Sequence, residues 1–249
     1  MVILKAPWEI ERLRASNRVV ACALEALAQA VKPGVTTLEL DRIAEDFLRQ
    51  AGAAPAFKGY KGYPFALCAS VNEEVVHGMP AERALVEGDI VSLDVGAIVD
   101  GYYGDGAVTL PVGTISASAE RLLRVTREAL ERGVRAARRG ARLGDISHAV
   151  QAHVERHGYS VVRTFVGHGI GKQLHEEPQI PNFGPPGRGP VLLPGLVLAI
   201  EPMVNAGGPE VEILPDRWTA VTVDRSLSAH FEHTVAITED GPEVLTRAE

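Results

Sequence analysis

Five side chains that could hold metal ions stand in or beside apolar runs of this 249-residue sequence. They are Asp94, Asp105, His168, Glu201 and Glu232. Four carboxylates with one imidazole form a hard, oxygen-rich ligand set, which suits Mn, Fe(II) or Co, or Zn under some conditions, better than the thiolate- and histidine-rich sets of structural zinc. These residue types therefore indicate a site for divalent metal ions.

Asp94 and Asp105 flank a predicted β-hairpin whose two-residue turn is Asp100-Gly101. In this register Asp94 lies opposite Ala107, which makes the two carboxylates diagonal neighbours, about 7–8 Å apart at the backbone, on one face. From there both can reach metals about 3.5–4 Å apart. A single acid beside a turn is commonly solvated, but the apolar run VSLDVGAIV makes Asp94 hard to expose. A bound cation would remove the cost of burying both charges.

The other three candidates rest on weaker local patterns. Glu201 ends the apolar run LVLAI and precedes Pro202. Glu232 lies in HFEHTVAIT, where the alternation is blurred, so a metal ligand and a salt-bridge partner are equally good readings. His168 lies in GHGIG, where glycines let the backbone approach a ligand closely. A lone histidine of this kind is more often structural or solvated than metal-binding.

The sequence also repeats itself. Segment 86–96 aligns with 193–203, which places Asp94 on Glu201, and segment 31–52 aligns with 137–158. Two matches in the same order, about a hundred residues apart, predict two similar halves, roughly 7–110 and 117–240. We therefore expect one catalytic domain over residues 1–249, with a pseudo-twofold axis near the site.

The periodicity predicts helices followed by strands, twice over. Helices are expected at about 7–31, 36–52, 117–139 and 145–157. Strands are expected at 67–72, 89–99, 102–110, 159–166, 196–204 and 228–238, and the Pro- and Gly-rich segment 178–195 is expected to be a loop. This order predicts an α+β fold, with helices backing a curved, mostly antiparallel sheet.

Composition limits the setting in which the protein acts. A net charge of −7 argues against a general binder of DNA or other nucleic acid. No apolar run approaches the roughly 18 residues that span a bilayer, and the N-terminal stretch is too charged for a signal peptide. Only Cys22 and Cys68 occur, so no disulfide framework is expected. We predict a cytoplasmic protein without membrane contact.

At these residues the sequence resembles bacterial type I methionine aminopeptidases, which have the pita-bread fold. The resemblance extends over about residues 7–246, and its motifs are weak singly but specific together. They are NEEVVHGMP (72–80), GHGIG (167–171), LHEEP (174–178), IEPM (200–203) and SAHFEHT (228–234). The spacings from His168 to Glu201 and from Glu201 to Glu232 are about thirty residues each, which matches type I rather than type II enzymes.

The resemblance implies a ligand set for two divalent ions. Asp105 and Glu232 would bridge the ions, Asp94 would complete one site, and His168 with Glu201 would complete the other. A monovalent cation, Na or K, would bind at a separate place. Its ligands would be the backbone oxygens of Asn72 and Glu74, together with Ser228.

The resemblance also implies a substrate site. His77 and His175 match the two active-site histidines that do not bind metal. The positions that line the methionine pocket are Tyr60, Tyr63, Cys68 and Trp218. Leu174 and Phe57 depart from the residues of some well-known members, which affects the shape of the pocket.

The activity implied is removal of the initiator methionine from nascent chains, with a small second residue preferred. Glu201 would shuttle a proton, His175 would bind the carbonyl oxygen, and His77 the scissile nitrogen. Two alternatives remain open: an Xaa-Pro peptidase of the same fold, and a non-catalytic binding protein of the same fold. The former usually carries an additional N-terminal domain, and the latter has lost metal ligands.

The expected partners are the N-termini of nascent polypeptides, met by a monomeric enzyme. Segment 121–142 holds eight arginines against Glu128 and Glu131, and helical spacing gathers several on one face. An ordinary solvated helix surface is the more common explanation of such a pattern. The sharper hypothesis is a transient, salt-sensitive contact with the ribosome.

Overall fold

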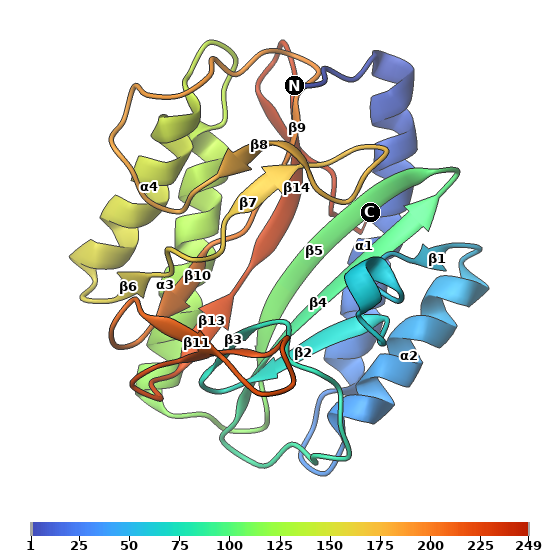
Figure 1. Cartoon of the computed structure of the whole chain (residues 1–249), viewed down its shortest axis with the longest axis vertical. Coiled ribbons are helices and arrows are strands. Elements are labelled where there is room, and N and C mark those ends of the chain that lie inside the picture. Colours follow the sequence, from blue (N-terminus) through green and yellow to red (C-terminus); the bar gives the residue numbers. More distant parts are fainter. Residues whose placement is uncertain (1, 249) are drawn as a thin grey trace.

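The computed structural model describes residues 2–248, and its helices lie on one side of a curved sheet (Figure 1). Helices α1 and α2 cover one half of the sheet, and α3 and α4 cover the other half. The helices are α1 (Pro7–Ala30), α2 (Thr37–Gln50), α3 (Ala117–Ala136) and α4 (Leu143–Arg156), with a short 3-10 turn at Tyr60–Gly62. All four long helices were predicted from the sequence, with ends that differ by at most about three residues.

Local sequence signals set the ends of these helices. Pro7 occupies the first turn of α1, where the missing N–H costs nothing. At α2 the capping box is reciprocal: Glu39 N donates to Thr36 Oγ1 (3.1 Å), and Thr36 N donates to Glu39 Oε2 (2.7 Å). Ser116 caps α3 by accepting from Ala119 N. These caps fix the helices that lie behind the sheet.

The main sheet has nine strands, and its strand pairs are antiparallel. Its central path is β1-β4-β5-β14-β9-β7-β8, with β2 also paired to β4 and β15 to β14. The bounds are β1 (Ala54–Pro55), β2 (Leu67–Val71), β4 (Ile90–Val99), β5 (Tyr102–Pro111), β7 (Gly167–Gly169), β8 (Glu176–Ile180), β9 (Val197–Ile200), β14 (Glu232–Ile237) and β15 (Pro242–Val244). The β4–β5 register pairs Asp94 with Ala107, as predicted.

Two small three-stranded sheets flank the main sheet at the lower end of Figure 1. One has the order β13-β10-β6 and the other β11-β12-β3. Their strands are β3 (Glu74–Val76), β6 (Ser160–Val161), β10 (Met203–Asn205), β11 (Val211–Ile213), β12 (Ala220–Thr222) and β13 (Ser228–His230). The predicted α+β class with a curved, mostly antiparallel sheet is confirmed.

The two halves repeat each other in conformation as well as in sequence. Helices α2 and α4 both have 14 residues and start 106 positions apart (143 minus 37). The glycines that the repeat pairs share left-handed backbone angles: Gly34 and Gly140 (φ 93° and 82°), Gly52 and Gly158 (73° and 80°), and Gly88 and Gly195 (95° and 93°). A side chain disfavours this conformation, which explains why glycine stands at both copies.

The halves meet between β5 and β14. These two strands pair over only two residues each, with Glu232 opposite Ala107 and His233 opposite Gly106. Behind it, each helix pair packs into its own cluster of buried apolar side chains. The seam between the halves therefore runs through the middle of the sheet.

Three predicted strands are shorter or interrupted. The run at 159–166 forms only β6, because the chain leaves the small sheet after Val162 N donates to Met203 O. The run at 196–204 breaks after β9, where Pro202 lacks an N–H for the ladder. The run at 228–238 breaks at Phe231, between β13 and β14. Two of the five candidate ligands, Glu201 and Glu232, stand directly beside these breaks.

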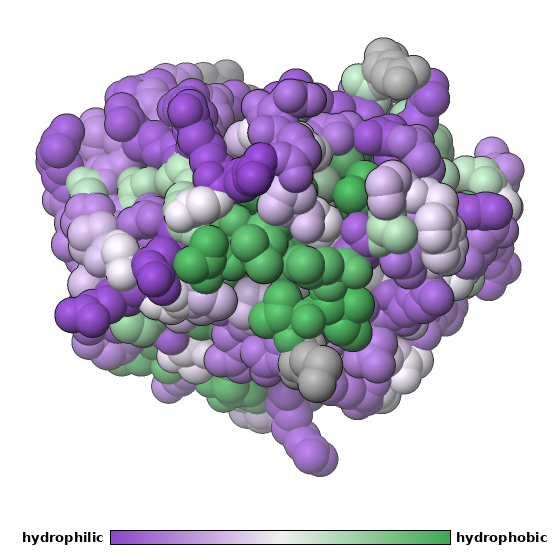
Figure 2. All heavy atoms as spheres, turned by 90° about the horizontal axis from the view of Figure 1, so that it is seen from above, coloured by the Kyte–Doolittle hydropathy of each residue, from purple (hydrophilic) through white to green (hydrophobic). Residues whose placement is uncertain are grey.

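The surface is mainly hydrophilic, with an apolar patch in the view from above (Figure 2). The exposed apolar side chains of the molecule include Val2, Ile3 and Leu4 of the N-terminal segment. Within residues 2–248, no helix combines the length and the apolar character required to cross a membrane.

Candidate metal centre and adjoining pocket

Five neighbouring elements of the main sheet bring the predicted metal ligands together. Asp94 lies on β4, Asp105 on β5, Glu232 at the start of β14, Glu201 directly after β9, and His168 in the middle of β7. These strands follow one another along the central path β4-β5-β14-β9-β7. Residues separated by up to 138 positions (232 minus 94) thus meet on either side of the seam.

The side chains are close enough to share bound ions. His168 Nε2 lies 3.5 Å from Glu201 Oε1 and 3.7 Å from Asp105 Oδ2. Ligand atoms of Asp105, His168 and Glu232 all lie within 4.8 Å of one another. Asp94, Asp105, Glu201 and Glu232 also line a common cavity with His168.

Burial makes this cluster unfavourable as a set of free carboxylates. It raises the pKa of Asp94 to about 7. The pKa values of Asp105, Glu201 and Glu232 are raised well above the ordinary range, by burial first and then by the neighbouring carboxylates. The buried atoms Asp94 Oδ1, Asp105 Oδ1 and Glu232 Oε1 have no hydrogen-bond partner. Oxygen atoms in this state fit a bound divalent cation, which would supply both the charge and the missing partner.

The imidazole of His168 is prepared as a ligand. Its Nδ1 donates to the backbone oxygen of Gly169 (3.0 Å), which leaves the lone pair of Nε2 facing Asp105 and Glu201. Burial, aided by nearby His175, lowers the pKa of His168 to about 3, so the ring is neutral at pH 7. These surroundings favour a metal-ligand role for His168 over a structural or solvated one.

These pKa shifts predict how stability of the metal-free chain depends on pH. Above pH 7 the unfolded carboxylates have already lost their protons, whereas the folded chain still releases them, so the free energy of unfolding should fall as pH rises. The buried histidines do not contribute above about pH 7.5, because they are neutral in both states. Chemical denaturation after chelation should show decreasing stability from pH 7.5 to 9. A flat profile would contradict the raised carboxylate pKa values.

Helix α1 holds the backbone of Asp105 from behind the sheet. A side chain at Gly104 would meet Ser16 C at 2.7 Å and Asn17 N at 2.8 Å, so glycine permits this close approach. Asn17 Oδ1 then accepts from Asp105 N (3.2 Å), and Thr234 Oγ1 donates to Asp105 O (2.9 Å). The carboxylate is thereby fixed through its own peptide groups.

Sequence reasoning assigned no role to Asn17 or His230. His230 is buried, its Nε2 lies 3.7 Å from Glu201 Oε2, and burial lowers its pKa to about 3. The available signal for His230 was its position in SAHFEHT, two residues before Glu232. Asn17 gave no signal, because its contact with Asp105 spans 88 positions.

A cavity of about 200 Å³ opens beside the carboxylates. Tyr63 and Trp218 pack edge to face in its wall, with ring centroids 5.0 Å apart. Tyr63 is fixed because its hydroxyl contacts the backbone oxygens of Leu67 and Gly78. The structure places all four predicted pocket residues in this wall, together with both positions that depart from the family pattern; the six are Phe57, Tyr60, Tyr63, Cys68, Leu174 and Trp218.

His77 and His175 line the same cavity as the metal ligands. His175 Nδ1 is hydrogen-bonded to Tyr60 Oη (2.8 Å), and its ring centroid lies 4.3 Å from that of His168. The His77 ring packs edge to face against Phe165, with centroids 5.3 Å apart. Burial lowers the pKa of each histidine to about 4, so both are neutral hydrogen-bonding groups at pH 7.

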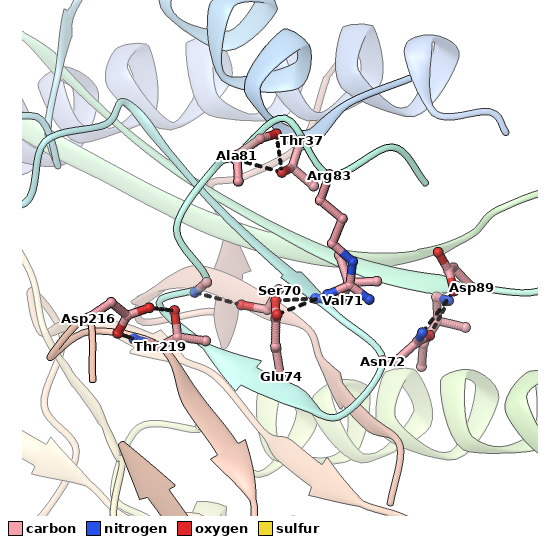
Figure 3. Close-up of polar contacts among 12 residues, drawn as sticks. Thr37, Ser70, Val71, Asn72, Glu74, Ala81, Arg83, Asp89, Asp216 and Thr219 are labelled. Atoms are coloured by element: carbon pink, nitrogen blue, oxygen red, sulfur yellow. Dashed lines mark hydrogen bonds and ion pairs between the residues drawn. The ribbon is translucent and has the colours of Figure 1, made fainter. Parts of the chain in front are cut away.

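A network of polar contacts holds the segment that presents His77 (Figure 3). Gly78 N donates to Ser70 Oγ (3.0 Å), and Glu74 Oε2 accepts from Val71 N (2.8 Å). Thr37 and Ala81 exchange two hydrogen bonds. His77 itself has a positive φ of 59°, an uncommon conformation that surrounding contacts must maintain.

The residues predicted for a monovalent cation also lie close together. Asn72 O accepts from Ser228 N (2.9 Å), and Glu74 follows in the same hairpin. The side chain of Asn72 bridges Asp89 Oδ1 and Ile90 N, which fixes its left-handed backbone (φ 57°). Figure 3 shows Asn72 and Asp89 facing each other beside Glu74.

A buried centre of carboxylates and one histidine, with a small cavity and two neutral histidines beside it, defines a metal-dependent hydrolase. Comparison with known proteins agrees, since residues 11–239 match metallopeptidase family M24. The chain belongs to this family. Its curved sheet with two helix pairs is the pita-bread fold.

Individual relatives cover the whole chain. It is 55% identical over 247 residues to methionine aminopeptidase 1 of Bacillus subtilis (strain 168), covering 99% of this chain and 100% of that protein. The crystal structure of methionine aminopeptidase from Thermotoga maritima matches with a TM-score of 0.98 and 50% identity, over 99% of this chain and 100% of that chain. Prolidase from Pyrococcus furiosus shares the fold, with a TM-score of 0.79 at 24% identity, but this chain covers only 66% of it.

Proposed function

We propose that this chain is a type I methionine aminopeptidase that acts as a single catalytic domain. It hydrolyses the bond after an N-terminal methionine and prefers a small second residue. The observation that carries the proposal is that the five metal ligands line the same small, mainly apolar cavity as the pocket residues. Full-length identity of about 50% to methionine aminopeptidases supports the same activity.

The donor set supports two divalent ions, drawn from Co, Mn, Fe(II) and Zn. Asp105 and Glu232 would bridge them, with Asp94 on one side and His168 with Glu201 on the other. Three of these carboxylates have a buried oxygen without a hydrogen-bond partner. When bound, the ions supply Lewis acidity that activates water and polarises the peptide carbonyl.

The protein's own side chains then position and protonate the substrate. Glu201 is the proton shuttle, because a carboxylate that holds one of the ions would lie within reach of the water activated there. His175 donates a hydrogen bond to the carbonyl oxygen, with its orientation set by Tyr60. His77, which lines the same cavity, contacts the scissile nitrogen.

The cavity accounts for selection of methionine. An unbranched thioether is flexible and polarisable, so it packs well against aromatic rings such as those of Tyr63 and Trp218. Burial raises the pKa of the Cys68 thiol, so Cys68 contributes a neutral, apolar surface rather than a nucleophile. The side-chain cavity adjoins the metal ligands directly. A methionine whose side chain fills the cavity would therefore place its free α-amino group beside the ions, which explains why a free amino terminus is required.

Peptide hydrolysis tests this proposal against the alternatives. Met-Ala-Ser should be cleaved, much faster than a Met-Lys peptide, and cleavage should stop on chelation and return with metal. Xaa-Pro peptides of equal length should remain intact. Faster cleavage of Xaa-Pro would instead favour the proline-specific activity, and no cleavage in any metal would favour a binding protein.

A substitution in the cavity wall should change selectivity more than catalysis. In Trp218→Ala the ring that packs against Tyr63 is lost, so the preference for Met over Leu, measured as the ratio of kcat/KM values, should fall by roughly tenfold, the scale of one hydrophobic contact. Exposed Trp8, 60% accessible, provides a matched control in Trp8→Ala. An unchanged ratio in Trp218→Ala would mean that the side-chain pocket lies elsewhere.

Several finer features belong to the same proposal. Nascent polypeptide N-termini are the substrates, the enzyme is a cytoplasmic monomer, and Asn72, Glu74 and Ser228 bind Na or K. A transient ribosome contact through the arginines of residues 121–142 belongs to the proposal as well. Three of these eight arginines form ion pairs: Arg124 with Glu128, Arg135 with Glu131, and Arg139 with Glu239.

A further inference from the structure

A second group of metal-ligating side chains lies behind the sheet, on the face between α3 and α4. It comprises Glu128 of α3, His153 of α4, and His157, the C-cap residue that follows α4. Histidines four positions apart lie on one face of a helix, one turn above the other. Residue 128 faces them from the neighbouring helix, with which α4 packs closely. None of these residues takes part in the metal centre of the proposed peptidase.

The three side chains converge at distances typical of ligands that share one ion. Their ligand atoms all lie within 4.8 Å of one another. His153 Nε2 is 3.1 Å from Glu128 Oε2, and the two imidazole centroids are 4.4 Å apart. In a tetrahedral site with bonds of about 2.0–2.2 Å, adjacent ligand atoms are separated by about 3.4 Å.

Both histidines present an unoccupied ring nitrogen. His157 Nδ1 lies 2.8 Å from His153 O, and since a carbonyl oxygen only accepts, this nitrogen carries the proton and Nε2 keeps its lone pair. This arrangement is the usual support of a metal-binding histidine. His153 is only 5% exposed, and its Nε2 is buried without a hydrogen-bond partner.

The carboxylate is also oriented toward the histidines. Arg124 Nη1 holds Glu128 Oε1 at 3.3 Å, so that Oε2 faces His153. Arg121 Nη2 donates to His157 O (2.8 Å), which ties the end of α4 to α3. The three ligands are therefore held in place by contacts of their own, independent of a bound ion.

We propose that Glu128, His153 and His157 form a binding site for one zinc ion, which links α3 to α4. Two imidazoles and one carboxylate suit zinc, and a water would complete the tetrahedron at the partly exposed side. The site is outside the catalytic cavity, so its ion has a structural effect. Zinc held there stabilises the half of the protein whose helices back β9 and β14.

A simple ion pair between His153 and Glu128 is the competing explanation. It needs no metal ion, because even a neutral imidazole with its proton on Nε2 can donate to Glu128 Oε2, whereas zinc binding requires the proton on Nδ1. Arg132, Arg135 and Arg156 line the adjoining groove, and their charges oppose a bound cation. Neutral histidine nitrogens bind zinc through their lone pairs, so these charges weaken the site without removing it.

Crystals soaked in zinc locate the ion directly. Anomalous diffraction at the zinc edge should show a peak between the three side chains in addition to the active centre. The active centre serves as the internal control for the soak. A filled active centre with no peak between α3 and α4 would overturn the proposal.

Solution binding separates a real site from binding at crystal concentration only. Wild-type protein should bind one zinc per chain more than His157→Ala, as measured by equilibrium dialysis at micromolar zinc and elemental analysis. His148→Ala, which removes an exposed histidine of α4, should match the wild type. The zinc-dependent part of Tm should decrease only in His157→Ala, while cleavage of Met-Ala-Ser stays the same. Equal zinc content in all three proteins would refute the site, even if a crystal peak were present.

Discussion

Asp105→Ala is expected to lower cleavage of Met-Ala-Ser to background and to release both metal ions. Asp105 stands on β5, which lies between β4 and β14, and its carboxylate is within ligand distance of His168 and Glu232. Its removal would therefore take a ligand from each proposed ion. Loss of Lewis acid catalysis amounts to several kcal/mol, or on the order of 10³-fold in rate. Elemental analysis and initial rates measure both effects in one preparation.

The control is Asp46→Ala, which removes an exposed carboxylate from α2. It should retain full activity and full metal content. Retention of two metals per chain in Asp105→Ala would contradict the bridging role.

Asp105→Asn adds a test with the opposite sign. Without metal, its neutral amide removes a buried charge that Asp94 and Glu201 repel, so the metal-free variant should be more stable than the metal-free wild type above pH 7. With metal the order should reverse, because only the wild type gains binding energy. A purely structural role for Asp105 would give the same order under both conditions.

His175→Ala is expected to lower kcat by about 10²–10³-fold while both metals remain bound, the usual cost of losing one donor to a developing oxyanion. The ring is neutral at pH 7, since its pKa is lowered to about 4 by burial and by Lys61. Between pH 6 and 8 the ratio of variant to wild-type rate should therefore stay constant.

Tyr60→Phe should have a smaller effect on kcat, because it removes only the hydrogen bond that orients His175. His148→Ala is again a matched histidine control. A parallel decrease in metal content and kcat in His175→Ala would show that this residue supports the metal centre rather than the substrate.

The sequence allowed prediction of features that short segments determine. The turn Asp100-Gly101 fixed the register that puts Asp94 opposite Ala107, and the capping box fixed the start of α2. The pseudo-repeat was visible because both copies need glycine at the same left-handed positions. The α+β class and the family followed from these patterns, together with the motifs.

Contacts between distant segments could not be predicted in the same way. From the sequence, Glu232 could equally be a metal ligand or a salt-bridge partner. Only the pairing of β14 with β5 shows that its carboxylate is buried. Asn17 reaches Asp105 only because Gly104 lets α1 approach the sheet. Glu128 and His153 lie on different helices, so no local sequence pattern predicts their contact.

The short pairing between β5 and β14 has a consequence for the motions of the protein. In the main sheet, two residue pairs join the halves, Glu232 with Ala107 and His233 with Gly106. The proposed bridging ligands, Asp105 and Glu232, come from opposite sides of this junction. Bound ions would thus act as a clasp, and amide hydrogen exchange along β5 and β14 should slow more on metal loading than exchange within either helix pair. Metal loading would then activate the enzyme and stabilise the junction between its two halves at the same time.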